Sequence, residues 1–418
     1  MKNRELYLKK LLEHKDSDLI KIITGVRRCG KSSLLILFKD YLLKKGVNKN
    51  KIIEINFESL EYSEITNYKA LYDYIKNKIT SKKDKYYILL DEIQEVAEWE
   101  KALRSFRVDF NCDLYVTGSN AYLLSGELAT YLSGRCIQIK MLPLSFKEYL
   151  SFYGDEQVGL KLEGKDLTFQ GKKLSFDNKE QLFKDYLMYG GLPSLANLKQ
   201  IPNVKTDYLK DIYDMVLKRD VIARNNITDV GLLEKVVRYI SQNIGSPVSS
   251  KKISDYLTSS GNPTTHNTVD NYLNFLENAY IIYKISRYDI KGKSMLKTLG
   301  KYYIVDTGIR NAIIGYRDSD MGHILENIVY LELIRRGYEV NIGKNKELEV
   351  DFIAINHETK KYYQVAYILT DENINREVNS LLTISDNYEK ILISTNKDYI
   401  LDKEGIKLVN IIDFLLEE

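Results

Sequence analysis

The first 150 residues alternate between short apolar runs and stretches in which apolar residues recur at helical spacing. The apolar runs predict buried strands over residues 19–24, 51–57, 86–92 and 113–120. Helical spacing predicts helices over residues 33–43 and 68–79, between successive strands. Strands and helices in this alternation predict a doubly wound α/β domain with a parallel sheet.

A glycine-rich loop joins the first predicted strand to its helix. Residues 25–32 read Gly-Val-Arg-Arg-Cys-Gly-Lys-Ser and fit G-x-x-x-x-G-K-S, the phosphate-binding loop (P-loop). Gly25 and Gly30 allow backbone N–H groups to face phosphate oxygens, and the next helix adds its positive end. We expect Lys31 to reach the β- and γ-phosphates and Ser32 to bind Mg²⁺. A chance glycine turn is the alternative, but the flanking strand and helix favour ATP. The other expected contacts are Val26, Arg27, Arg28, Cys29 and Ser33.

Two carboxylates end the third apolar run. Asp91 and Glu92 follow Leu90 directly. We expect Asp91 to hold Mg²⁺, through water or Ser32, and Glu92 to polarise the attacking water. A solvated turn is the alternative for such an acid pair.

Two further polar positions are candidates for roles around the γ-phosphate. If the fourth strand lies between the P-loop strand and the acidic strand, Ser119 or Asn120 would lie near this phosphate, where Asn120 would orient water or sense the nucleotide. Ordinary turn chemistry is the alternative. Arg135, just before an expected strand over 136–139, would act as a finger on the nucleotide of a neighbouring subunit, through self-association. The alternative is a surface arginine at a helix end.

Four motifs together resemble a prokaryotic family of AAA+ ATPases, over nearly the whole chain. The motifs are the P-loop, Asp91-Glu92-Ile93-Gln94, Thr117-Gly118-Ser119-Asn120, and Ser133-Gly134-Arg135 followed by Pro143-Leu144-Ser145-Phe146. The AAA+ assignment comes from this resemblance, because the spacing alone indicates only a P-loop NTPase. In related ATPases a G-x-P in the lid packs its proline against adenine. Gly191-Leu192-Pro193 resembles it and makes Pro193 an expected adenine contact, with a plain helix terminator as the alternative.

We expect four parts along the chain: an ATPase core over 1–150, a helical lid over 151–225, a winged-helix-like domain over 226–315 and a nuclease-like domain over 316–418. In the third part, predicted helices over 230–242, 251–257 and from residue 264 precede a strand and a basic hairpin. The basic residues of that hairpin are Arg287, Lys291, Lys293 and Lys297. This pattern is typical of a winged helix that reads double-stranded DNA. A protein contact is the alternative, because the third helix carries Asp270 and Glu277.

The C-terminal part has the predicted order α-β-β-β-α-β and resembles the PD-(D/E)XK nuclease fold. Glu326 and Asp351 match two acids of that family, which hold Mg²⁺. Gln364 stands in place of the next carboxylate, and Ala366 stands in place of the lysine that positions water. We therefore predict that this lobe is catalytically inactive. A solvated strand edge is the alternative for its two acids.

Composition bears on the partners, the redox environment and the membrane association that we expect of the protein. The 61 basic and 58 acidic residues give a net charge of +3, which indicates neither a polyanionic nor a polycationic partner. Three cysteines and four histidines are scattered without ligand spacing, so we expect free thiols in a reducing cytoplasm and no structural zinc. No apolar run is long enough for a membrane span, and we expect no membrane association.

These features predict an ATP hydrolase that binds Mg-ATP and couples its turnover to conformational change and to DNA binding. The alternative is a slow ATP-dependent switch or scaffold that acts on a protein partner. Gln364 and Ala366 argue against a third hypothesis, an active ATP-dependent nuclease.

Overall fold

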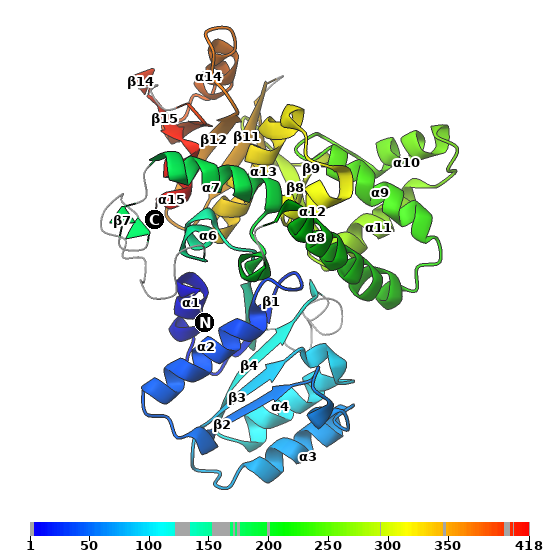
Figure 1. Ribbon diagram of the computed structural model, residues 1–418, viewed down its shortest axis with the longest axis vertical. Coiled ribbons are helices and arrows are strands. Elements are labelled where there is room, and N and C mark those ends of the chain that lie inside the picture. Colours follow the sequence, from blue (N-terminus) through cyan, green and yellow to red (C-terminus); the bar gives the residue numbers. More distant parts are fainter. Residues whose placement is uncertain are drawn as a thin grey trace. The chain divides into compact units, whose positions relative to one another are not determined.

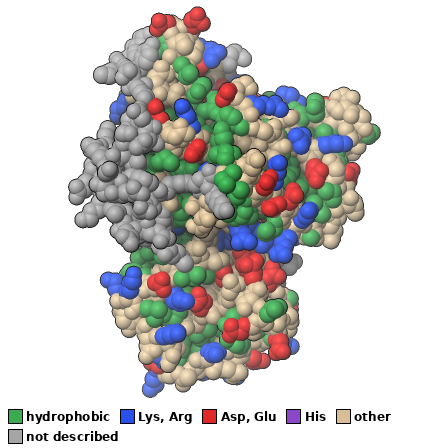
Figure 2. All heavy atoms as spheres, in the orientation of Figure 1, with side chains coloured by type: hydrophobic (Ala, Val, Ile, Leu, Met, Phe, Trp, Pro, Cys, Tyr) green, Lys and Arg blue, Asp and Glu red, His purple; other side chains and the backbone are tan. Residues whose placement is uncertain are grey.

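The computed structural model describes residues 4–121, 134–152, 168–169, 172–173, 176–198, 201–292, 294–345, 348–396, 402–403 and 405–417 (Figure 1). The chain forms two compact units. The first comprises Met1–Met141 with Asn278–Tyr280, and the second comprises Leu142–Glu277 with Ile281–Glu418. Basic and acidic side chains both occur on the visible face of each unit, in line with the small net charge (Figure 2).

The first unit is built on a five-stranded parallel sheet with the order β2-β3-β4-β1-β5. The strands are β1 (Ile20–Thr24), β2 (Ile52–Asn56), β3 (Tyr86–Asp91), β4 (Cys112–Gly118) and β5 (Cys136–Lys140). The central strands β1 and β3 are buried along their whole length, as their apolar runs require. Strand β4 lies between β1 and β3, which meets the condition on which the expected roles of Ser119 and Asn120 depend.

Helices cover both faces of this sheet (Figure 1). They are α1 (Glu5–Glu13), α2 (Lys31–Lys44), α3 (Tyr68–Lys78) and α4 (Trp99–Asp109). Alternate residues of the strands, such as Ile22 and Leu114, share one hydrophobic core with α3 and α4. Tyr115 points the opposite way and packs on Phe38 of α2, which contacts α1. The predicted doubly wound α/β fold is therefore confirmed for this unit.

The second unit begins with helices that meet in an aromatic core. They are α6 (Phe146–Phe152), α7 (Phe176–Tyr189), a short 3₁₀-helix (Pro193–Asn197), α8 (Pro202–Val216) and a π-helical extension (Leu217–Ala223). Phe146 and Tyr149 of α6 pack against the Tyr186 ring of α7. A later helix, α12 (Thr307–Ile314), packs against both α7 and α8.

Three helices and a hairpin follow in the order expected from the sequence. They are α9 (Val230–Gln242), α10 (Ser250–Ser259), α11 (His266–Asn278), β8 (Ile282–Asp289) and β9 (Ser294–Ile304). Side chains of Asp229 and Ser249 cap α9 and α10 by accepting backbone N–H bonds. An antiparallel bridge joins Val248, between α9 and α10, to Gly300 of the hairpin. Lys293 and the Lys297 side chain lie outside the described residues.

The hairpin belongs to the sheet of the C-terminal lobe. Eight strands have the order β14-β15-β13-β12-β11-β10-β8-β9, and β8 pairs in parallel with β10. The remaining strands are β10 (Glu339–Asn345), β11 (Leu348–Ile355), β12 (Lys360–Ala366), β13 (Glu389–Ser394), β14 (Asp402–Lys403) and β15 (Ile406–Asn410). The helices are α13 (Met321–Arg335), α14 (Ile374–Leu382) and α15 (Ile411–Leu416). One sheet therefore continues across the boundary expected at residues 315–316. None of the helices described here is long and apolar enough to cross a membrane.

Candidate nucleotide site

The P-loop forms the turn between β1 and α2, as the sequence predicts. Its backbone is left-handed at Arg28 (φ 66°) and at Gly30 (φ 104°), which caps α2. Gly25 has φ 149°, and a Cβ built on it would lie 2.2 Å from the carbonyl oxygen of Met141. A glycine is therefore required at position 25 both by its backbone angle and by the close approach of the chain that leaves β5.

Lys31 is the first residue of α2 and is only 4% exposed. Its Nζ donates hydrogen bonds to the carbonyl oxygens of Gly25 (3.1 Å) and Val26 (3.3 Å). The same Nζ lies 3.8 Å from Oε1 of Glu92. The ammonium group is thus directed over the loop, where two neutral oxygens and one longer ionic contact hold it.

Asp91, the last residue of β3, lies beside Ser32. Its carboxylate accepts hydrogen bonds from the hydroxyl of Ser32 and from Oγ1 of Thr117 (2.5 Å). Burial raises the pKa of Asp91, and these two hydrogen bonds oppose the rise. Mg²⁺ prefers a carboxylate or two, together with water and substrate phosphates. One carboxylate and one hydroxyl at the start of a P-loop helix fit that requirement.

Glu92 follows β3 in a left-handed conformation, with φ 56°. Its backbone N–H donates to Oγ1 of Thr117 (2.9 Å), and Nε2 of Gln94 donates to its carboxylate. Thr117 therefore contacts both acids at once, although the sequence assigned it no role. The available signal was a hydroxyl residue near the end of a run that predicts a buried strand.

Ser119 and Asn120 lie at the carboxyl ends of the parallel strands, and Arg135 lies at their amino ends. Ser119 and Asn120 are buried directly after β4, whose last residue, Gly118, pairs with Thr24 before the P-loop. Arg135 is exposed at the opposite end, where its carbonyl oxygen accepts the N–H of Ile20. Five strand residues span about 16 Å. Arg135 is therefore remote from the P-loop of its own chain.

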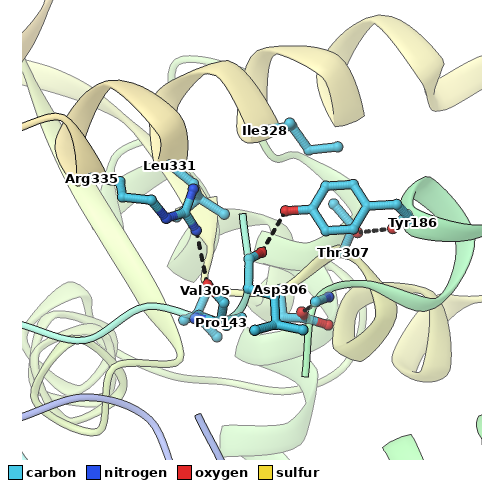
Figure 3. A pocket seen from close by; sticks show the side chains of 10 residues that line it. Pro143, Tyr186, Val305, Asp306, Thr307, Ile328, Leu331 and Arg335 are labelled. Carbon is cyan, nitrogen blue, oxygen red and sulfur yellow. Dashed lines mark hydrogen bonds between the residues drawn. The ribbon is translucent and has the colours of Figure 1, made fainter. Parts of the chain in front are cut away.

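Pro193 belongs to the second unit. Residues near it form a hydrogen-bonded junction between residues 143–144, the end of α7 and Asp306 (Figure 3). Gly190 ends α7 with φ 75°, and its N–H bonds to the carbonyl of Tyr186, which is helix-terminator geometry. Gly191 donates its N–H to Asp306 (2.7 Å) and accepts from the N–H of Leu144 (2.7 Å). The two glycines thus have a structural use here, and the adenine contact of Pro193 stays a prediction.

The junction encloses a small pocket beside Asp306 (Figure 3). Tyr186 donates its hydroxyl to the carbonyl of Leu144 (2.9 Å), and Arg335 donates to the carbonyl of Pro143 (2.9 Å). Burial raises the pKa of Asp306 to about 6, against three backbone N–H bonds that lower it. The pocket has room for about one water molecule. It is a packing junction and not a ligand site.

The acids of the C-terminal lobe surround a buried lysine. Nζ of Lys301, on β9, lies 2.9 Å from Glu349 and 3.5 Å from both Glu326 and Asp351. The side chains of Glu326 and Asp351 are 12% and 10% exposed, so the solvated-edge alternative is wrong. The sequence missed Lys301 because this residue lies outside the nuclease-like motif. Gln364 is turned toward α14, where its Nε2 donates to Glu377 (3.0 Å).

The pKa values of Asp351 and Glu326 are shifted in opposite directions. Burial raises the pKa of Asp351 to about 7, and the charge of Glu326 adds to the rise. Burial acts on Glu326 too, but Lys301 and His323 keep the pKa of Glu326 below its usual value. Within the described residues, no group of three or more His, Cys, Asp or Glu side chains could hold a metal ion.

Comparisons with known proteins agree with the fold of the first unit. Residues 17–150 match an AAA domain family, and residues 180–320 match a domain of unknown function. A Walker-type ATPase of Pyrococcus abyssi aligns with a TM-score of 0.50 at 16% identity, over 75% of this chain and 96% of that one. This likeness shows a shared fold alone, and it supports the expected AAA+ ATPase-like architecture.

Two relatives match along nearly their whole length. An uncharacterized protein of Haemophilus influenzae is 41% identical over 417 residues, which cover 100% of this chain and 99% of that protein. An uncharacterized protein of Methanocaldococcus jannaschii is 32% identical over 417 residues, which cover 97% of this chain and 84% of that protein. The chain therefore belongs to the family of these H. influenzae and M. jannaschii proteins.

Proposed function

We propose that the protein binds and hydrolyses Mg-ATP at the P-loop. The observation that carries this proposal is the convergence of Lys31, Ser32, Asp91 and Glu92 at the carboxyl ends of β1 and β3. Ligands of open parallel sheets bind at that edge. Phosphoryl transfer needs mainly positioning and charge stabilisation, and these residue types supply both.

Each residue has a distinct expected role. Lys31 would bind the β- and γ-phosphates, while the oxygen atoms of Ser32 and Asp91 would hold Mg²⁺, which neutralises charge on the phosphates. Glu92 would accept a hydrogen bond from the attacking water and orient it. Asn120 would sense the γ-phosphate. The remote position of Arg135 leaves it only a role on the nucleotide of a neighbouring copy, and Pro193 would pack against adenine.

Steady-state ATP hydrolysis in Mg²⁺ tests this proposal. We expect Glu92→Gln to bind ATP normally and to lose turnover, because a neutral amide polarises the attacking water much less than a carboxylate does. Turnover at the wild-type rate in Glu92→Gln would contradict the assigned role. Turnover that persists in Lys31→Ala would refute the site as a whole.

We further infer that the segment from α9 to β9 is a winged helix that binds double-stranded DNA. Its three helices, its hairpin and the bridge between Val248 and Gly300 support this architecture. The exposed face of α11 carries Asn267, Asn271 and Asn274. Asparagine amides bond well to adenine edges in the major groove. Exposed Lys251 and Lys252 at the start of α10 are available for phosphates.

One observation favours the alternative, a slow ATP-dependent switch that acts on a protein partner. Helix α11 contains Asp270 and Glu277 and has no lysine or arginine along His266–Asn278. DNA-binding helices draw much of their affinity from positive charge. A polar helix surface with acidic residues and no basic ones also suits a protein contact.

ATP turnover measured with and without double-stranded DNA, at 50 and 200 mM salt, separates these two functions. DNA coupling predicts that DNA stimulates turnover, that the stimulation falls with salt, and that Lys252→Ala weakens it. Turnover indifferent to DNA at both salt concentrations would favour a protein partner. Lys82→Ala, a substitution of an exposed lysine in the first unit, is the matched control.

We also propose that the C-terminal lobe is a nuclease-like fold without nuclease activity. The order α13, β10, β11, β12, α14, β13 supports the fold. Lys301 among the acids and Gln364 turned toward Glu377 support the loss of activity. We expect no cleavage of linear or supercoiled DNA in Mg²⁺ or Mn²⁺. Cleavage that disappears in Asp351→Ala would overturn this conclusion.

A further inference from the structure

A buried carbonyl group of the P-loop is bonded to the N-terminal segment of the chain. When a P-loop turns its N–H groups toward phosphate, its carbonyl groups are directed elsewhere and need donors of their own. Cys29 is fully buried, so solvent does not reach it. The donor to its carbonyl oxygen is the Nη1 atom of Arg4, at 2.9 Å, from a position 25 residues earlier in the chain.

Arg4 is itself fixed in place by helix α1. It is 2% exposed, and its guanidinium lies 4.8 Å from the centre of the Tyr7 ring. Tyr7 and Leu11, at 1% and 0% exposure, anchor α1, which contacts both α2 and β5. Burying an arginine costs free energy unless its donors are satisfied. The burial of Arg4 against the P-loop therefore indicates that its hydrogen bond to Cys29 has a specific role.

The bonded carbonyl lies at the most constrained point of the loop. Cys29 stands between Arg28 and Gly30, the two residues with left-handed backbones. Left-handed residues in a turn create the concave set of N–H groups that binds anions. A donor that holds the Cys29 carbonyl from outside fixes the direction of the neighbouring N–H groups, and its positive charge adds to that of Lys31.

We propose that Arg4 is a positioning residue of the nucleotide site, which holds the P-loop in its phosphate-binding conformation from the side remote from the phosphates. This inference rests on the proposed function of the site. Because the bond acts on the loop and not on the reacting atoms, it strengthens binding of substrate and transition state equally. Such uniform binding affects KM and Kd, and not kcat.

The test compares Arg4→Met, Arg4→Lys and, as a control, Lys9→Met on the exposed face of α1. We expect Arg4→Met to raise Kd and KM for Mg-ATP about tenfold, since a charge-assisted bond to a buried acceptor is lost, with kcat within about twofold. Arg4→Lys keeps a charged donor and should recover most of the affinity. Lys9→Met should behave as wild type. If Arg4→Met does not fold, Arg4→Gln, a neutral donor, should show the same KM effect at smaller size.

Two outcomes would overturn the inference. One is an Arg4→Met protein with unchanged Kd for Mg-ATP. The other is a fall in kcat with unchanged KM, which reports a smaller active fraction and thus a merely structural role. Lys31→Ala, measured in parallel, distinguishes a failure of the proposed ATP site from a failure of the role proposed for Arg4. ATP binding that survives in Lys31→Ala contradicts the proposed function itself, whereas its loss there with an unaffected Arg4→Met contradicts only the inference.

Discussion

Each unit of the molecule contains a buried lysine among carboxylates, and the two lysines are held very differently. In the first unit, Lys31 lies 3.8 Å from Glu92 and otherwise bonds to neutral carbonyl oxygens. In the second unit, Lys301 lies within 3.5 Å of Glu326, Glu349 and Asp351. Both lysine side chains are 4% exposed.

The difference shows that the partners of a buried lysine, more than its burial, decide what it can do. Three carboxylates raise the pKa of Lys301 above its ordinary value, in spite of the burial that acts to lower it. That lysine is charged, paired and committed to the fold. Lys31 stands at the N-terminal end of a helix, with partners that a phosphate group can readily replace. The first arrangement suits structure, and the second suits ligand binding.

The largest expected effect comes from removing the committed lysine. Lys301→Met leaves Glu326, Glu349 and the buried Asp351 without their shared cation, and we expect a loss of about 3–5 kcal/mol in the free energy of unfolding of the second unit. Chemical denaturation of the full chain, followed by circular dichroism, measures this loss. Lys284→Met, at an exposed position on β8, is the control and should be nearly neutral. Equal free energies of unfolding for the two variants would mean that Lys301 does not stabilise the second unit.

Removing the lysine of the P-loop should have the opposite effect, a loss of ligand affinity without a loss of stability. Lys31→Met should weaken ATP binding about a hundredfold or more, because the phosphates lose a direct cationic partner. Its unfolding free energy should stay near the wild-type value, since Lys31 bonds mainly to neutral oxygens. Isothermal calorimetry with Mg-ATP gives the affinity, and Lys44→Met at the exposed end of α2 is the matched control. A strongly destabilised Lys31→Met would remove the distinction between the two lysines.

The hydroxyl of Thr117 bonds to both acids of the proposed nucleotide site, so we expect its removal to lower ATP turnover. Thr117→Val leaves Oδ1 of Asp91 and the N–H of Glu92 without this partner. We expect ATP turnover to fall about tenfold, together with about 1–3 kcal/mol of stability. Thr117→Ser retains the hydroxyl and should restore most of the turnover. If Val and Ser variants behave alike, the hydroxyl does not organise the acids.

A smaller effect concerns the pH dependence of the C-terminal acids. The pKa of Asp351 is raised to about 7 in the folded chain, so the folded state binds its proton more tightly than the unfolded state does. Stability from this group is therefore full below pH 4 and is lost as the pH rises toward 7. Glu326, Glu349, Lys301 and His323 are the charged groups around it.

Asp351→Asn should remove that loss. The Tm of wild type relative to the variant should fall between pH 5 and pH 8, as measured by thermal unfolding in buffers of equal ionic strength. Tm curves that run parallel over this range would show that Asp351 has an ordinary pKa in the folded protein.

The same two sites show what the sequence can and cannot predict. The P-loop, its strand and helix, and the acids after β3 are local patterns, so Lys31, Ser32, Asp91 and Glu92 could be identified from spacing. The contacts of Arg4, Thr117 and Lys301 join segments far apart in the chain, and they depend on strand register and helix packing. Lys301 lies in a run that simply reads as a strand, and only pairing of β8 with β10 brings it into the C-terminal sheet.

The domain plan shows the same limit. Helix and strand order over residues 230–304 could be read from periodicity and turn residues, yet those signals are silent on which sheet a hairpin joins. The parallel pairing of β8 with β10 makes the hairpin part of an eight-stranded sheet. A long-range pairing of this kind leaves no local mark in the sequence.

The most direct test of the central claim is thermal unfolding of wild type and Lys31→Met with and without saturating Mg-ATP. A ligand that binds only the folded state raises Tm according to its affinity. We predict that Mg-ATP raises the Tm of the wild-type first unit and raises that of Lys31→Met far less, with equal Tm values for the two proteins in the absence of nucleotide. An equal rise in both proteins, or none in wild type, would contradict the assignment of the P-loop as an ATP site.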